Sequence, residues 1–147
     1  MDIKSTLQTD LQDAIRHGEE IRKSTLRMTM TAIKLAEVEK GSQLDEAACL
    51  AVIQKEIKSR RESIADAEKA NRPDLIPPSE AEIVILQGYL PVAFSQEELE
   101  NLAKVAITEA GATSIREMGQ VMKILMPRLQ GRATGDQASQ VVRKLLQ

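Results

Sequence analysis

Apolar residues recur every three or four positions along most of the 147-residue chain, which is the spacing of one face of an α-helix. Near the N-terminus, for example, Ile3, Leu7, Leu11 and Ile15 are each four residues apart, and Gly18 follows as a stop signal. Few stretches are rich in the β-branched residues that favour strands. The pattern predicts an all-α protein with helices at about 2–17, 20–40, 45–71, 80–89, 95–110, 114–129 and 136–146.

The second and third predicted helices each carry an apolar face. In the second helix, we expect apolar contacts from Leu26, Met30, Ile33, Leu35 and Val38. In the third helix, the apolar stripe consists of Leu50, Ile53, Ile57 and Ile64. Arg60 and Arg61 occupy positions in this helix where another apolar residue is due. This interruption makes the middle of the third helix a candidate for a role beyond core packing.

Polar residues at helix starts sharpen several boundaries. A Ser followed three residues later by Glu is the capping-box pattern, and it occurs at Ser79–Glu82, Ser95–Glu98 and Ser114–Glu117. Asp45 and Asp136 are placed to cap the third and seventh helices. Pro127 lies late in the sixth helix and predicts a kink or an early end, with a turn through Gln130.

Two breaks divide the chain. The segment 72–78 holds three prolines within six residues and cannot continue a helix. The segment 89–94 contains both aromatic residues of the protein, and we interpret it as a hinge. We therefore expect an N-terminal helical domain of about four helices at residues 1–92 and a small C-terminal three-helix domain at residues 93–147.

Charge is unevenly distributed, although the whole chain carries a net charge of only −2. Residues 113–147 contain six basic and two acidic residues, a net charge of +4, which leaves −6 for the rest of the chain. A basic end on an acidic body is a modest indication of a polyanionic partner. The basic residues that we expect to contact phosphates there are Arg116, Lys123, Arg128 and Arg132.

The stretch 111–135 combines these cations with four glycines and three methionines. Met118, Met122 and Met126 recur every four residues, which is typical of a helical core face. We interpret Met122 as core, and Met118 as either core or an adaptable binding surface. Gly119 is unusual inside a helix, where glycine costs roughly 1 kcal/mol relative to alanine. It indicates the close approach of another backbone or of a ligand.

A second basic cluster lies in the third helix and consists of Lys55, Lys58, Arg60 and Arg61. Glu56 and Glu62 are interleaved with it, and the pairs Glu56–Arg60 and Lys58–Glu62 have the spacing of ion pairs along a helix. Two interpretations remain open. Such a run is most often a solvated face, and less often a patch that binds phosphates or a partner.

Groups suited to catalysis are scarce in the sequence. Cys49 and His17 are the only cysteine and histidine; we interpret Cys49 as a buried thiol and His17 as a solvent-facing residue at a helix end. We therefore predict no catalytic residue, no metal site and no cofactor. No apolar run approaches the roughly 20 residues of a membrane span, and the first residues do not resemble a signal peptide. We expect no membrane partner and a cytoplasmic location.

Several motifs resemble the GatB/YqeY family. In the C-terminal part, residues 111–112, 117–122 (EMGQVM) and 131–135 (GRATG) resemble the tail domain that ends the B subunit of the glutamine-dependent tRNA amidotransferase. Several motifs of the N-terminal part resemble the stand-alone YqeY branch. They are residues 26–28 (LRM), 54–61 (QKEIKSRR), Arg72 with 74–75 (DL), and 89–91 (YLP). The resemblance covers essentially the whole chain.

The resemblance implies an all-α protein with a helical N-terminal domain and a three-helix tail. It also implies an association with tRNA, because the tail domain helps to hold the tRNA while amidation takes place in other domains. The family's label, a carbon–nitrogen ligase with glutamine as amido-N-donor, then describes the complex rather than this chain alone.

Our leading hypothesis is a non-catalytic binding module for tRNA or another RNA. Binding would involve phosphates rather than bases, because aromatic residues that could stack on bases are nearly absent. The alternative is a protein-interaction adaptor that docks on an enzyme through its methionine-rich or basic helices. A third possibility, an enzyme that acts alone, rests only on the family label.

Overall fold

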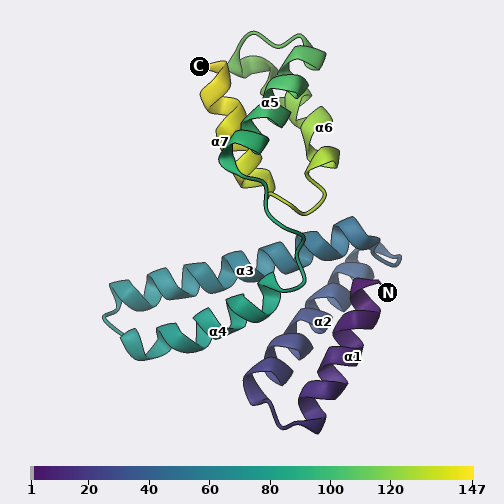
Figure 1. Ribbon diagram of the computed structural model, residues 1–147, viewed down its shortest axis with the longest axis vertical. Coiled ribbons are helices and arrows are strands. Elements are labelled where there is room, and N and C mark those ends of the chain that lie inside the picture. Colours follow the sequence, from purple (N-terminus) through teal and green to yellow (C-terminus); the bar gives the residue numbers. More distant parts are fainter. Residues whose placement is uncertain (1) are drawn as a thin grey trace. The chain divides into compact units, whose positions relative to one another are not determined.

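The computed structural model describes residues 2–147 and confirms the all-α class, with no strand among these residues (Figure 1). Its α-helices are α1 (Ile3–Arg16), α2 (Glu20–Lys40), α3 (Glu46–Lys69), α4 (Ile76–Gln87), α5 (Gln96–Ala110), α6 (Met118–Leu129) and α7 (Gly135–Leu146). Two short 3₁₀ turns precede α4 and α6, namely η1 (Pro73–Leu75) and η2 (Ile115–Glu117).

The chain forms two compact units, which we call the N-terminal unit and the C-terminal unit. The first ends at Leu90, and the second comprises Pro91–Gln147. The boundary expected from the sequence lies two residues later, and the assignment of two independent folding domains stays a prediction. Each unit has its own buried apolar residues.

The N-terminal unit consists of two helical hairpins, α1 with α2 and α3 with α4 (Figure 1). One apolar cluster is centred on Leu7, Leu26, Ile33 and Cys49, and another on Ile53, Ile57 and Leu86. Ile3 and Tyr89 pack against both clusters and so link them into one core.

The buried face of α2 differs from the one expected. Leu26 and Ile33 are buried as predicted, but Leu35 and Val38 are 60% and 73% exposed. Thr25 and Thr29 are fully buried instead. Their hydroxyls donate to the carbonyls of Ile21 and Thr25 at 2.8 Å, so burial leaves no hydroxyl unpaired. Both faces of this helix carry residues that a core can accept. The prediction of the buried face was therefore right for Leu26 and Ile33 and wrong for Leu35 and Val38.

The start of α4 also differs from the prediction. The helix begins at Ile76 rather than after Ser79, and Pro77 and Pro78 lie in its first turn. Proline is tolerated there because the first N–H groups of a helix have no carbonyl partner within the helix. Glu82, expected to complete a capping box, instead binds Arg60 of α3.

Helix caps in the C-terminal unit agree with the sequence at one place and differ at two. Ser95 and Glu98 form the predicted capping box at α5. Ser114 makes no such cap, because η2 intervenes and Glu117 accepts a hydrogen bond from the Thr113 N–H. At α7 the cap is Thr134, which pairs reciprocally with Gln137, and not Asp136.

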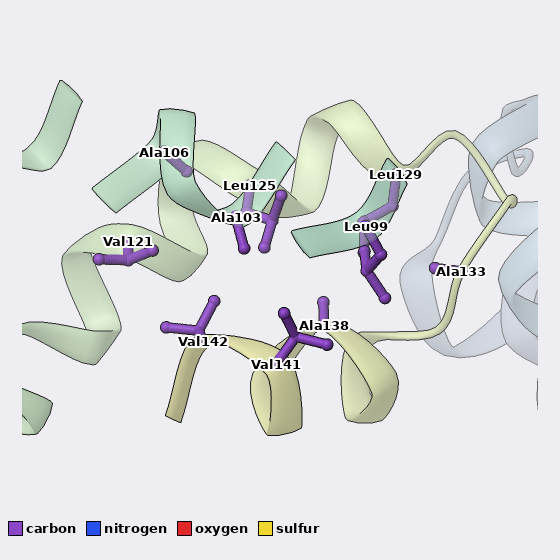
Figure 2. Close-up of a cluster of buried hydrophobic side chains, with 10 residues drawn as sticks. All are labelled: Leu99, Ala103, Ala106, Val121, Leu125, Leu129, Ala133, Ala138, Val141 and Val142. Carbon is purple, nitrogen blue, oxygen red and sulfur yellow. The ribbon is translucent and has the colours of Figure 1, made fainter. Parts of the chain in front are cut away.

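The core of the C-terminal unit is built from three helices (Figure 2). Its buried residues are Leu99, Ala103 and Ala106 of α5, Val121, Leu125 and Leu129 of α6, Ala133, and Ala138, Val141 and Val142 of α7. Four of these are alanines, and their small side chains allow the helices to approach closely. Met118 and Met122 are partly buried against this cluster, whereas Met126 is exposed. The sixth helix passes through Pro127 and ends at Leu129, and Gln130 makes the expected turn with φ of +49°.

Candidate functional site

The exposed side of η2 and α6 carries three of the residues singled out from the sequence. Arg116, Gly119 and Lys123 are all exposed and follow one another at intervals of three and four residues, about one helical turn each. A Cβ atom at Gly119 would meet no other atom within 4 Å, leaving aside its chain neighbours and its own helix backbone. The close approach of another backbone, one of the two explanations expected for Gly119, is therefore not found among residues 2–147.

Arg128 differs from Arg116 and Lys123 because its guanidinium forms an ion pair. Its Nη2 donates to Glu109 Oε2 of α5 at 2.6 Å, and both side chains are partly exposed. The ion pair joins α5 to α6, and it reduces the charge that Arg128 offers to a phosphate. A surface pair of this kind contributes about 0–1 kcal/mol to stability, so a stronger anion can displace the glutamate.

Arg132 turns toward the chain that leads into α5. Its Nε donates to the Val92 carbonyl at 2.8 Å, and its guanidinium lies 4.0 Å from the ring centroid of Phe94. The Phe94 N–H donates in turn to the Arg132 carbonyl at 2.9 Å. Arg132 therefore holds the segment before α5 in place, a role that the sequence reasoning missed. The only phenylalanine of the chain, next to a capping serine, was the available signal.

A pocket of about 390 Å³ lies beside this contact, between the start of α5 and α7. Phe94, Leu99 and Val141 contribute apolar surface to it, and Gln137, Gln140 and Lys144 contribute polar groups. The sequence reasoning did not single out Gln140 or Lys144. Such a lining can form hydrogen bonds and hold an anionic group, but it contains no His, Cys, Asp or Glu side chain.

The basic cluster of α3 is divided between surface and interior. Lys55, Lys58 and Arg61 are exposed, but Arg60 is only 6% exposed. Its Nε donates to Glu82 Oε2 at 2.8 Å, and its Nη1 donates to Glu56 Oε2 at 3.0 Å. The prediction of Arg60 as a surface contact for RNA or a partner is thus corrected. It occupies the interrupted position of the apolar stripe and joins α3 to α4 instead.

A group of charged residues links the helices of the N-terminal unit. Arg22 of α2 binds Asp13 at 3.0 Å and Glu19 at 2.8 Å, and lies 3.7 Å from Asp10. The hydrogen bond from Arg22 holds the pKa of Asp13 below its usual range. Asp10 accepts a hydrogen bond from the Tyr89 hydroxyl, which connects the end of the α4 hairpin to α1. These interactions give Asp10, Asp13 and Glu19 a structural role.

The single thiol and the single imidazole lie where the sequence predicts. Cys49 is buried, and this burial raises the pKa of its thiol, so the thiol stays protonated and unreactive at neutral pH. His17 is exposed at the end of α1, with Nδ1 2.9 Å from the Asp13 carbonyl oxygen. Among residues 2–147, no group of three or more His, Cys, Asp or Glu side chains is arranged to bind a metal ion. Within the same residues, no helix has the length and apolarity needed to span a membrane.

Comparison with known protein families shows which family the chain belongs to. A family model described as Yqey-like protein matches residues 4–146, almost the entire sequence. The chain belongs to the YqeY-like family. This membership confirms the resemblance of the N-terminal motifs to the YqeY branch. The relation of the C-terminal unit to the tail of the amidotransferase stays a prediction.

Several relatives share the printed name "Altered inheritance of mitochondria protein 41, mitochondrial". The protein from Lachancea thermotolerans is 35% identical over 113 residues, which cover 74% of this chain and 60% of the relative. That from Pyrenophora tritici-repentis is 32% identical over 130 residues, covering 86% and 71% respectively. That from Meyerozyma guilliermondii is 31% identical over 120 residues, covering 78% and 63%. The chain thus spans less than two thirds of the first and third of these relatives.

The names of these relatives correct one prediction. They are named as mitochondrial proteins, and this finding overturns the cytoplasmic location expected for the chain. That expectation depended only on the lack of a recognisable signal peptide or membrane span, which are weak grounds for assigning a compartment.

Proposed function

We propose that this YqeY-like protein is a non-catalytic binding module for tRNA or another RNA. Support for the proposal comes mainly from the row of Arg116, Gly119 and Lys123 along η2 and α6, which offers two exposed cations on either side of an open stretch of backbone. Phosphates along a nucleic-acid strand favour such a surface, since each cation that binds a phosphate releases a condensed counterion.

Two further cations of the C-terminal unit would add contacts outside this row. Arg128 can exchange its exposed partner Glu109 for a phosphate, and Arg132 is partly exposed beside the pocket that Lys144 borders. Lys55, Lys58 and Arg61 of α3 are exposed and would contribute a second contact region. Sequence-specific readout is not proposed, because Phe94 is the only aromatic residue of the C-terminal unit and Arg132 already covers its ring.

Titration of the purified protein with bulk tRNA tests the proposal. Binding at low ionic strength should weaken steeply with salt, and Arg116→Glu or Lys123→Glu should each weaken it by about three- to tenfold. Lys104→Glu is the matched control, because Lys104 is an exposed lysine on α5 outside the proposed surface. The absence of any binding at low salt, or an equal loss in the control, would exclude the proposal.

The alternative is a protein-interaction adaptor that docks on an enzyme. The exposure of Met126 next to Lys123 favours it, because methionine side chains adapt to many partner surfaces. Recovery of a partner that resists nuclease and high salt supports the adaptor, whereas loss of the partner on nuclease treatment supports RNA. For the chain alone, we expect no glutamine-dependent amidation of mischarged tRNA.

A further inference from the structure

One side of α2 carries four exposed large apolar side chains, more than any other described helix. Ile21, Met28, Leu35 and Val38 are 47–73% exposed, and they follow one another at intervals of seven, seven and three residues. These intervals place them on one side of the helix, with Ser24 and Thr31 at the intervening heptad positions. We call this row the α2 stripe. None of its large side chains is buried, and the Met28 sulfur lies close to a buried residue, 3.9 Å from Nη2 of Arg60.

The length and width of the α2 stripe fit another helix. From Ile21 to Val38 it extends over about 26 Å, since each helical residue advances about 1.5 Å. Its apolar side chains lie at heptad position a (Ile21, Met28 and Leu35) and at one position d (Val38), which belong to the narrow seam of a helix–helix contact. A helix that lies on a membrane surface typically has a broader apolar face, and the hydroxyls of Ser24 and Thr31 interrupt this one.

Two cations border the stripe. Arg27 directly precedes Met28, and Lys34 directly precedes Leu35. Both cations are exposed, and they occupy the heptad position g, which flanks the apolar seam. Neither forms an ion pair within residues 2–147, in contrast to Arg22 and Lys23 of the same helix. The flank therefore offers two unneutralised positive charges, about two helical turns apart, to whatever covers the apolar row.

The charge pattern fits a second copy of this chain less well than it fits an acidic partner. If two α2 helices pair antiparallel about the middle of the stripe, the flanks that carry Arg27 and Lys34 face each other, so Arg27 lies near Lys34 of the other copy. If they pair parallel, this flank faces the opposite flank of the other helix, so Lys34 lies near Glu39 but Arg27 lies near Ala32. Like charges thus oppose the antiparallel arrangement, and the parallel one leaves Arg27 of both copies without an acidic partner.

We propose that the α2 stripe is a docking site for an amphipathic helix of a different protein, one whose apolar seam is bordered by acidic residues. Such a helix buries the four exposed side chains and pairs its carboxylates with Arg27 and Lys34. This surface is separate from the residues proposed to bind RNA, and the two proposals stand or fall independently.

Designed peptides provide a direct test. One probe is a 21-residue helical peptide with leucine at the a and d positions of three heptads and glutamate at the flanking e and g positions. A matched probe carries lysine at those e and g positions. Because like charges at e and g disfavour self-pairing, both peptides stay largely monomeric. By fluorescence anisotropy, the glutamate peptide should bind the full-length protein at least tenfold more tightly than the lysine peptide.

Variants of the protein sharpen the test. Leu35→Glu and Val38→Glu should each weaken binding of the glutamate peptide at least tenfold. Val105→Glu is the matched control, since Val105 is a 50% exposed apolar residue on α5, and it should leave binding unchanged. The double variant Arg27→Glu/Lys34→Glu should invert the preference, so that the lysine peptide binds more tightly. Unchanged far-UV circular dichroism and Tm show that each variant is folded.

Four outcomes would overturn the proposal. These are no binding of either peptide, equal binding of both, a preference that the charge reversal does not change, and equal weakening by Val105→Glu. Two controls identify other occupants of the stripe. If light scattering finds a dimer that Leu35→Glu dissociates, a second copy covers it. If vesicles containing phosphatidylglycerol bind in a Leu35-dependent manner while the peptides do not, a membrane covers it.

Discussion

Arg60 shows how a charged residue can take a core position. Its guanidinium interrupts the apolar stripe of α3, where it makes hydrogen bonds to Glu56 and Glu82 and contacts the Met28 sulfur at 3.9 Å. Burial of a cation is costly unless its donors are paired. Here carboxylates from α3 and α4 supply the partners, and the cation fixes how the two helices meet.

Replacement of Arg60 by alanine should therefore destabilise the protein. The two glutamates are 20% and 25% exposed and stay partly hydrated once their partner is lost. We expect a loss of about 2–3 kcal/mol in the free energy of unfolding, somewhat below the usual cost of breaking a fully buried pair. Urea denaturation of Arg60→Ala and of the control Arg61→Ala measures it. Arg61 is exposed, and its replacement should cost less than about 0.5 kcal/mol.

Tyr89 gives a second prediction at the residue scale. Burial, and then the hydrogen bond that its hydroxyl donates to Asp10, raise the pKa of Tyr89 above its usual value near 10. The folded state therefore holds the phenolic proton more tightly than the unfolded state does. This contribution to stability is complete below the unfolded pKa, and it is lost as the pH rises above about 10.

The ultraviolet absorbance of tyrosinate tests this directly, because Tyr89 is the only tyrosine and there is no tryptophan. The titration should shift to higher pH in the native protein relative to the protein in denaturant. Asp10→Asn is the informative variant, since it keeps a hydrogen-bond acceptor but removes the negative charge. It should move the native titration part of the way back, and an unshifted native titration would contradict the assignment.

At the scale of helices, the clearest contrast is between two serines that share one sequence pattern. The Ser95 hydroxyl accepts a hydrogen bond from the Glu98 N–H, and the Ser95 N–H donates in return to the Glu98 carboxylate, whereas Ser114 makes no cap. Ser95→Ala should lower the free energy of unfolding by about 1 kcal/mol. Ser114→Ala should change it by less than about 0.5 kcal/mol. Thermal denaturation followed by circular dichroism compares the two, and equal effects would contradict the structure.

The helices themselves were largely predictable, because apolar periodicity and stop signals are local properties of the sequence. The second helix, for instance, has the expected bounds, Glu20–Lys40. Which face of it is buried was less predictable, since Thr25 and Thr29 become acceptable in a core only through bonds within their own helix. The first turn of α4 was misjudged because prolines stop a helix in its interior but not at its start.

The candidate site was predictable only as a set of cations. Arg116, Lys123, Arg128 and Arg132 are close in sequence, but Arg128 and Arg132 bind partners that are far from them in the chain. Glu109 is 19 residues from Arg128, and Val92 is 40 residues from Arg132. Such partners depend on how α5 and the segment before it pack against α6, which no local pattern specifies.

At the scale of the whole molecule, only part of the irregular segment between the two units is free of contacts with one unit or the other. Tyr89 packs in the core of the N-terminal unit, and Val92 and Phe94 are held by Arg132 within the C-terminal unit. Few residues are left unattached between these anchors. The hinge expected at residues 89–94 is therefore bound at both ends by specific contacts.

Arg132→Ala should release the C-terminal anchor and expose this segment. Limited digestion with chymotrypsin, which cleaves after aromatic residues, should then cut after Phe94 several-fold faster than in the unmodified protein. Arg132→Lys keeps a cation over the ring but loses the planar fork of donors, so its effect should be intermediate. Arg116→Ala is the control, and the same acceleration there would show that Arg132 is not the anchor.

The burial of the single cysteine allows the location of a bound partner to be determined. A thiol-modifying reagent reaches Cys49 only when the N-terminal unit opens, so the modification rate reports the population of that opened state. A ligand that binds the closed N-terminal unit lowers this population. An acidic helix on α2 would therefore protect Cys49 from modification, whereas RNA bound only to α6 would leave an independently opening N-terminal unit as reactive as before.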